Sequence, residues 1–234
     1  MKIKNPFAAW TRFEWWLWSV SMVVTAVCYI VSPTGDMLSL IASLIGVTAL
    51  LFLAKGHVLG QFLIIMFALL YSVISLEYRY YGELITYLGM TTPMAVVAAV
   101  QWLRHPYRDS SEVSVAKLTR RKVLWLCALT AAVTGVFYFI LGALGNENLL
   151  ISTLSVTTSF AAASLSALRS SYCSLAYACN DVVLIVLWVL ASIADISYLS
   201  MVICFIVFLI NDLYGFINWR RMERKQSENS PQSA

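Results

Sequence analysis

The chain has 234 residues, of which 60% are hydrophobic and 12% are charged, and its mean hydropathy is +0.78. A soluble globular domain needs far more polar surface than this composition supplies, so the sequence predicts an integral membrane protein. The formal net charge of +4 does not indicate nucleic-acid binding, because the positive residues lie beside apolar segments, where they set membrane topology and meet anionic lipid.

Eight apolar segments follow one another along the chain, each close to the ~20 residues that cross the hydrocarbon core of a bilayer. They are 13–31, 37–54, 58–76, 84–103, 123–144, 149–168, 173–193 and 198–219. Backbone polar groups find no partners in lipid, so these segments are expected to be α-helices. The predicted fold is therefore an all-α integral membrane protein with eight transmembrane helices.

The basic residues divide unevenly between the two sides of the membrane that these spans define. Fifteen of the sixteen Lys and Arg residues lie in the connections on the side of the termini, and only Arg79 lies on the other side. Cytoplasmic loops retain an excess of Lys and Arg during insertion. Both termini are therefore expected in the cytoplasm.

The fourth and eighth segments end alike. An amide, a Trp and an Arg stand in the same order at 101–104 and 218–221, although the ends of cytoplasmic helices in general favour Trp followed by Arg. Gln61 and Asn180 precede these two Trp residues by 41 and 39 positions. The pattern favours two copies of one three-helix unit, in which Gln61 and Asn180 are expected to occupy equivalent places and to face one central cavity.

The order of the segments then predicts the domain organisation. Two three-helix repeats, 37–104 and 149–222, flank a cytoplasmic loop and linking helix at 105–148. Three helices reverse the chain and a fourth restores its direction, so the copies are parallel and form a 3+1+3 core. Residues 1–36 are predicted to hold a peripheral helix, and 223–234 a disordered cytoplasmic tail.

Amide and aromatic side chains inside apolar segments predict a binding site, because polar groups at this depth are costly and usually face a bundle interior. Tyr177, Asn180 and Trp188 share one helical face, which suits a flat ring attached to a hydroxylated group. The candidate substrate-binding residues are Asn180, Gln61, Tyr177, Trp188, Asn211, Trp102, Asn218 and Thr92. The alternative is that such residues bond between helices, at about 0.6 kcal/mol each. Asp181 is expected either to pair with another helix or to be solvated.

Signatures of catalysis are absent from the sequence. His57 and His105 have no carboxylate at a useful spacing, and neither a phosphate-binding glycine loop nor a nucleophile elbow is present. The five Cys residues lie singly, without the spacing of metal ligands. We expect neither an enzyme nor a cofactor or metal, and an ATP-driven pump would need another chain to supply the ATPase.

Four stretches of the chain, Tyr80-Tyr81-Gly82-Glu83, Trp102, 180–188 and 211–219, carry a resemblance to a known family. Over about 37–222 the sequence resembles the PnuC family of nicotinamide riboside transporters, which is related to the SWEET sugar transporters. The resemblance implies a 3+1+3 core, alternating access around one central nucleoside site, and facilitated diffusion with cytoplasmic phosphorylation trapping the substrate. The family's Asn matches Asn180, whereas Ala176 stands where many members carry a Trp.

The resemblance implies uptake of nicotinamide riboside across a bacterial cytoplasmic membrane. Asn180 and Gln61 would bond its amide or ribose, and Tyr177, Trp188 or Trp102 would hold the cationic ring by cation–π contact. Because Ala176 departs from the family pattern, thiamine, riboflavin and deoxynucleosides stay as alternative substrates. An assembly or receptor subunit that transports nothing is the alternative of a different class. The sequence leaves open whether the protein, which contacts membrane lipid, forms a homo-oligomer.

Overall fold

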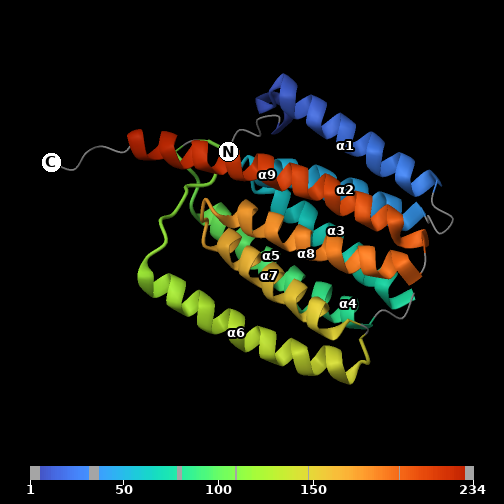
Figure 1. The fold of residues 1–234 in the computed structure, drawn as a ribbon. Helices are drawn as coiled ribbons and strands as arrows, with labels where there is room; N and C mark the ends of the chain where they lie inside the picture. Colours follow the sequence, from blue (N-terminus) through green and yellow to red (C-terminus); the bar gives the residue numbers. More distant parts are fainter. Residues whose placement is uncertain are drawn as a thin grey trace.

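The computed structural model describes residues 6–31, 37–77, 81–108, 110–146, 148–194 and 196–229. Within these residues, eight helices are long and apolar enough to cross a membrane, which confirms the predicted all-helical membrane fold and its eight spans. The helices form one bundle, with α1 and α6 on opposite sides (Figure 1). Several residues of the predicted charge pattern lie outside the described ranges: Lys2, Lys4, Asp36, Arg79, Glu147 and Asp195.

The first three-helix unit occupies residues 37–104. It consists of α2 (Met37–Ala54), α3 (Leu59–Glu77) and a third span made of α4 (Tyr81–Thr86), the π-helical turn η2 (Tyr87–Thr91) and α5 (Thr92–Arg104). The three parts of the third span follow one another without a break, in agreement with a single predicted span at 84–103.

The π turn has a local cause in Pro93. Proline has no backbone N–H, and its ring collides with the carbonyl group four residues earlier in a regular helix. The backbone N–H of Thr92 reaches Tyr87 O instead, five residues back, and Thr92 Oγ1 donates to the same carbonyl at 2.9 Å. The helical turn is therefore wider at Tyr87 and Thr91, two residues of the inner face of this span.

The second unit has the same order of elements. It consists of α7 (Leu149–Ala167), α8 (Cys173–Ala194), the short η3 (Ile196–Tyr198) and α9 (Leu199–Glu228). The linking helix α6 (Arg120–Ala143) packs on α7, while η1 (Pro6–Ala9) and α1 (Arg12–Val31) precede the first unit. Helix α1 packs on α2 and α9, and Glu14 accepts hydrogen bonds there from Lys55 (2.7 Å) and Tyr214 (2.7 Å).

The two units contact each other at corresponding helices, since α2 packs on α9 and α5 packs on α7. The turns after α2 and α7 also correspond. Gly56 and Arg169 both have a left-handed backbone, with φ of 62° and 57°. Their N–H groups donate to Leu53 O and Ser166 O, each at 2.9 Å. These bonds place residues 53–60 in register with 166–173.

A reciprocal pair of tryptophans joins the units at this end of the bundle. Trp102 of α5 donates from Nε1 to Ser166 O at 2.9 Å, and Trp219 of α9 donates from Nε1 to Leu53 O at 2.9 Å. The two rings lie 5.6 Å apart and are buried. Each unit therefore uses the Trp at its last helix to bond the end of the other unit's first helix.

Residues 112–116, which we call the strap, cross the same end of the bundle. Val113 N donates to Gly56 O and Ala116 N donates to Arg169 O, both at 2.9 Å, so the strap bonds both turns. The side chain of Gln226 accepts from Val115 N at 2.8 Å and donates to Val113 O at 3.1 Å.

The contact between α9 and the strap corrects the predicted boundary of the C-terminal tail. Helix α9 continues to Glu228, so the prediction of disorder is wrong for residues 223–228. The extension is fixed because Gln226 bonds the strap and Glu223 accepts a hydrogen bond from Ser171 at 2.9 Å.

The strap end of the bundle is closed by an apolar cluster. Leu50, Leu53, Trp102, Val113, Cys173 and Trp219 are buried together there. Both described ends of the chain lie at this end, because Phe7 packs on Phe52 and Gln226 bonds the strap. Lys55 and Arg169 lie in or beside the two turns that the strap bonds, and Arg104 and Arg220 lie near the two Trp residues at the ends of α5 and α9.

Candidate functional site

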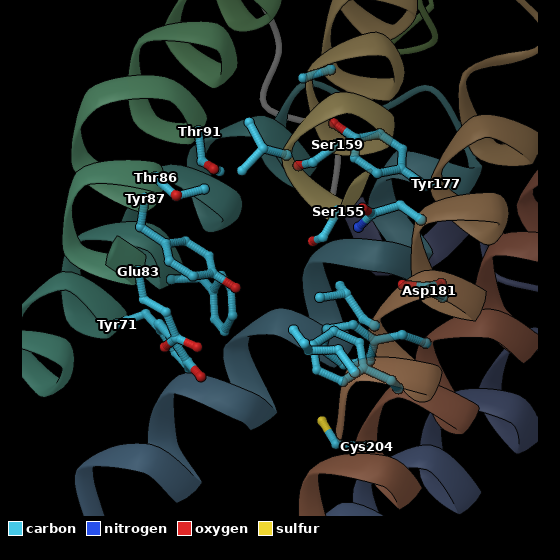
Figure 2. Close-up of a pocket in the computed structure, with 18 of the residues that line it drawn as sticks. Tyr71, Glu83, Thr86, Tyr87, Thr91, Ser155, Ser159, Tyr177, Asp181 and Cys204 are labelled. Atoms are coloured by element: carbon cyan, nitrogen blue, oxygen red, sulfur yellow. The ribbon is translucent and has the colours of Figure 1, made fainter. Parts of the chain in front are cut away.

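A cavity of about 320 Å³ lies between the two three-helix units. Its walls face each other in Figure 2: the first unit supplies Tyr71, Glu83, Thr86, Tyr87 and Thr91, and the second supplies Ser155, Ser159, Tyr177, Asp181 and Cys204. Leu50, Leu53 and Gln61 line it toward the closed strap end, and Asn146 and Asn148 line it toward the opposite end. This volume lies within the usual range for small-molecule sites, roughly 300–1,000 Å³.

The first-unit wall combines aromatic rings with a carboxyl group. The rings of Tyr71 and Tyr87 are 4.5 Å apart, and Phe67 lies 5.6 Å from Tyr71 and 5.9 Å from Tyr87. Figure 2 shows the side chains of Tyr71 and Glu83 next to each other on this wall. Aromatic faces beside a negative group form a favourable surface for a cationic ring.

Asn180 lies on the second-unit wall, as predicted, and also bonds a neighbouring helix. Its Oδ1 accepts a hydrogen bond from Thr158 Oγ1 of α7 at 2.8 Å, and the side chain is 7% exposed. Within the described part of the chain, Nδ2 donates to no other residue. The Thr158 bond therefore fixes the amide plane and leaves its two N–H donors for a ligand.

Tyr177 and Trp188 also line the cavity, but at different depths. They are eleven residues apart on α8, which corresponds to about 16 Å along the helix. Trp188 packs beside Tyr198 with the ring centroids 5.5 Å apart. A single flat ring can therefore stack on Tyr177 or on Trp188, but not on both at once.

Gln61 lines the floor of the cavity and is not the counterpart of Asn180. Its Nε2 donates to Ser166 Oγ at 2.9 Å, and the side chain is 3% exposed. The register of the turns pairs Gln61 with Ser174, and it pairs Asn180 with Phe67. The expectation that the two amides occupy equivalent places is therefore wrong.

Four predicted site residues lie outside the cavity wall, and each has a structural partner instead. Thr92 bonds the π turn, and Trp102 bonds Ser166 O inside the closed end. Asn211 donates to Ser21 Oγ at 3.0 Å and Val207 O at 2.8 Å, and Asn218 donates to Ala54 O at 2.8 Å. Thr92 supports its own span and the other three residues hold helices together, which corrects the assignment of all four to the substrate site.

The structure adds wall residues that were not among the eight candidates. Glu83, Tyr71, Tyr87, Ser155, Asp181 and Asp212 all line the cavity. The carboxyl groups within apolar segments were the feature that could have identified these residues. Neighbouring residues of a helix project in different directions, however, and the sequence does not show which of them faces the cavity. Asp212 faces the cavity, whereas its neighbour Asn211 faces α1.

The groups on the cavity wall that can carry a charge are all acidic. Glu83, Asp181 and Asp212 are the carboxylic acids among its described residues, which include no Lys, Arg or His. The ion pairs within the described ranges, Lys55–Glu14 and Arg220–Glu223, lie away from the cavity. Such a wall favours a neutral or cationic ligand over an anionic one.

Comparisons with known proteins agree with this architecture. The family model described as "Nicotinamide mononucleotide transporter" matches residues 36–221. The chain is similar to a nicotinamide riboside transporter PnuC of Neisseria mucosa, with 26% identity over 96% of this chain and 87% of the relative. It is similar to the PnuC of Haemophilus influenzae, with 23% identity over 96% of this chain and 97% of the relative.

A solved structure shares the fold. The crystal structure of the vitamin B3 transporter PnuC superposes with a TM-score of 0.79, at 24% sequence identity, over 94% of this chain and 95% of that chain. The family model covers both three-helix units and the linking helix between them. The protein is thus a multi-pass membrane protein and belongs to the nicotinamide mononucleotide transporter family.

Proposed function

We propose that this protein transports nicotinamide riboside across the bacterial cytoplasmic membrane. The observation that carries the proposal is the cavity between the two units, whose wall presents aromatic rings, the Asn180 amide and three carboxyl groups. Nicotinamide riboside has a flat cationic ring, an amide and a ribose, and each of these finds a matching group on the wall. The two relatives named above as nicotinamide riboside transporters support the same substrate.

The charge of the wall favours the riboside over its phosphate ester. A phosphate monoester adds about −1.5 to −2 charges at neutral pH. A cavity with three carboxyl groups and no basic side chain among its described residues would repel that charge. The riboside is therefore the proposed substrate, even though the family description names the mononucleotide.

Alternating access follows from the arrangement of the units, if the two are parallel repeats that rock about the cavity. The Trp102–Trp219 pair and the strap close one end in this structure, and the opposite motion would open it. The sequence holds no nucleotide-binding motif, so we propose facilitated diffusion, with phosphorylation in the cytoplasm retaining the product.

Uptake into proteoliposomes is the test of this function. Vesicles that contain the purified protein and unlabelled nicotinamide riboside are expected to exchange it for external labelled riboside without any ion gradient. Excess nicotinamide mononucleotide should compete poorly, whereas thiamine, riboflavin and deoxynucleosides test the other proposed substrate classes. Riboside binding without exchange would instead support a receptor, and strict dependence on a Na⁺ or H⁺ gradient would rule out facilitated diffusion.

The orientation is a separate prediction. We expect both termini in the cytoplasm, because the basic residues gather at the strap end. Single cysteines replacing Leu144 and Glu228, both exposed, are introduced into a cysteine-free background. An impermeant thiol reagent should label Leu144→Cys in intact cells and should label Glu228→Cys only after lysis. The reverse pattern would invert the topology.

A further inference from the structure

Two buried acids meet on the second-unit wall of the cavity. Asp181 of α8 and Asp212 of α9 are 4% and 5% exposed, and their carboxyl groups interact with each other. Oδ2 of Asp181 is buried and has no hydrogen-bond partner among the described residues. Both side chains line the cavity, and Figure 2 shows Asp181 on the wall opposite Glu83.

Two adjacent carboxylates without a counter-ion are unfavourable in a site of low dielectric, so the empty pair holds at least one proton. A proton between the two carboxyl groups lets one donate to the other, because an ionised carboxylate only accepts. The unpartnered Oδ2 of Asp181 is the atom that is left either to carry a second proton or to face a positive ligand.

Among the described residues that line the cavity, none is a Lys, Arg or His. The titratable side chains that line the cavity or interact with the pair include Tyr87 of η2, Cys173 and Tyr177 of α8, Cys204 of α9, Tyr29 of α1 and Glu83 of α4. Helix α7 contributes hydroxyl groups at Ser155, Thr158 and Ser159, and α2 has no titratable residue from Met37 to Ala54. A positive charge near the pair therefore has to come from solvent or from the ligand.

We propose that Asp181 and Asp212 form a cation subsite in which a proton on Asp181 Oδ2 exchanges for the positive ring of the substrate. One proton stays in the bond between the carboxyl groups, and the second leaves to solvent when the cationic ring arrives. Tyr177 precedes Asp181 by one helical turn on the same face of α8, so its ring is placed to stack on the same cation. This inference rests on the proposed function, and it adds that binding is linked to proton release.

The exchange predicts a pH dependence that only a charged ligand shows. A ligand that displaces one proton binds about tenfold more tightly for each unit of rising pH, until the empty pair has lost that proton, and then the affinity levels off. The neutral benzamide C-riboside has the same shape as nicotinamide riboside but no positive charge. Its affinity should not change with pH, because it displaces no proton.

Calorimetry on the purified full-length protein tests the inference. Nicotinamide riboside and benzamide C-riboside are titrated between pH 5 and pH 8, each in two buffers that differ in ionisation enthalpy. Proton release makes the measured enthalpy of nicotinamide riboside binding depend on the buffer at the acidic end. Asp181→Asn should remove this buffer dependence and the pH slope, and should weaken only the charged ligand. Asp212→Asn is the second variant, for the case that the first does not fold.

Two carboxyl-to-amide controls separate the alternatives. Glu223→Gln lies on α9 outside the cavity and should keep the wild-type pH slope. A slope that survives in Asp181→Asn and disappears in Glu83→Gln would overturn the proposal in favour of the other wall. A wild-type affinity for nicotinamide riboside that is the same at every pH would overturn the proton exchange alone. Failure of wild type to bind nicotinamide riboside at any pH would overturn the proposed function itself.

Discussion

Asn180→Ala is expected to weaken nicotinamide riboside binding by about ten- to a hundredfold, or roughly 1–3 kcal/mol. The reason is that Nδ2 of Asn180 is held toward the cavity by the Thr158 bond to Oδ1. Removing the amide leaves a polar group of the substrate unpaired in a site with little water. Calorimetry on purified variants that keep the wild-type melting temperature measures the effect.

Thr158→Val is the matched control for this prediction. It removes the bond between α7 and α8 but keeps the Asn180 amide in the cavity wall. If Asn180 binds substrate, Thr158→Val should cost much less affinity than Asn180→Ala, because only the orientation of the amide is loosened. Equal affinities for wild type and Asn180→Ala would show instead that the Asn180 side chain serves only to join the two helices.

Trp219→Ala is expected to lower the free energy of unfolding by about 3–5 kcal/mol, which is the usual cost of removing a large buried aromatic side chain. Trp219 is fully buried, its Nε1 bonds Leu53 O at 2.9 Å, and its ring lies against Trp102. Trp219→Phe keeps much of the packing and loses the N–H donor. Its cost should therefore be smaller, about 1–3 kcal/mol for the unpaired carbonyl group. Denaturant unfolding in detergent measures both values.

Trp125→Ala provides the comparison for the Trp219 variants. Trp125 is a residue of the same type on α6, but its side chain is 67% exposed on the outer face of the bundle. Its loss should change the unfolding free energy little, since surface substitutions away from special features usually stay within about 0.5 kcal/mol. If Trp219→Ala were no less stable than Trp125→Ala, the Trp pair would not hold the closed end together.

The helices could be predicted from the sequence because each span carries its own signal. Hydropathy and length locate a helix in lipid without reference to its neighbours. The predicted span at 84–103, for example, corresponds to the span at Tyr81–Arg104. The end of α9 was predicted wrongly, because its helical structure depends on contacts with other parts of the chain. Residues 223–228 are polar, and only their contacts with Ser171 and the strap keep them helical.

The site was predicted only in part, because the side chains that face the cavity depend on how neighbouring helices are aligned. Tyr177, Asn180 and Trp188 share a face of one helix, so their common exposure to the cavity follows from helical periodicity. The match of Gln61 with Asn180 relied instead on counting back from the two Trp residues. The turns after α2 and α7 align the two units differently. The sequence does not reveal this alignment, because Gly56 and Arg169 are different residue types that share a left-handed backbone.

The likeness of the two Trp-containing ends was a real signal with a different meaning. Trp102 and Trp219 do occupy matching places, as the hydrogen bonds to Ser166 O and Leu53 O show. A buried indole N–H needs an acceptor, and the free carbonyl groups at helix ends need donors. The hydrogen bonds from each indole N–H to a carbonyl group of the other unit explain why a Trp recurs there without lining the cavity.

The strap has a consequence for the symmetry of the two units. Gly56 O and Arg169 O are the same acceptor in two copies of one unit, and the strap reaches them with N–H groups three residues apart, at Val113 and Ala116. A dimer of separate three-helix chains would present the same pair of carbonyl groups, but it would have no single strand between them. A single strand can bond them only through different residues, Val113 and Ala116, so the two acceptors are not equivalent in this chain. The two units are also unequal at the cavity, where one carries Asn180 and the other carries Phe67 at the position in register with it.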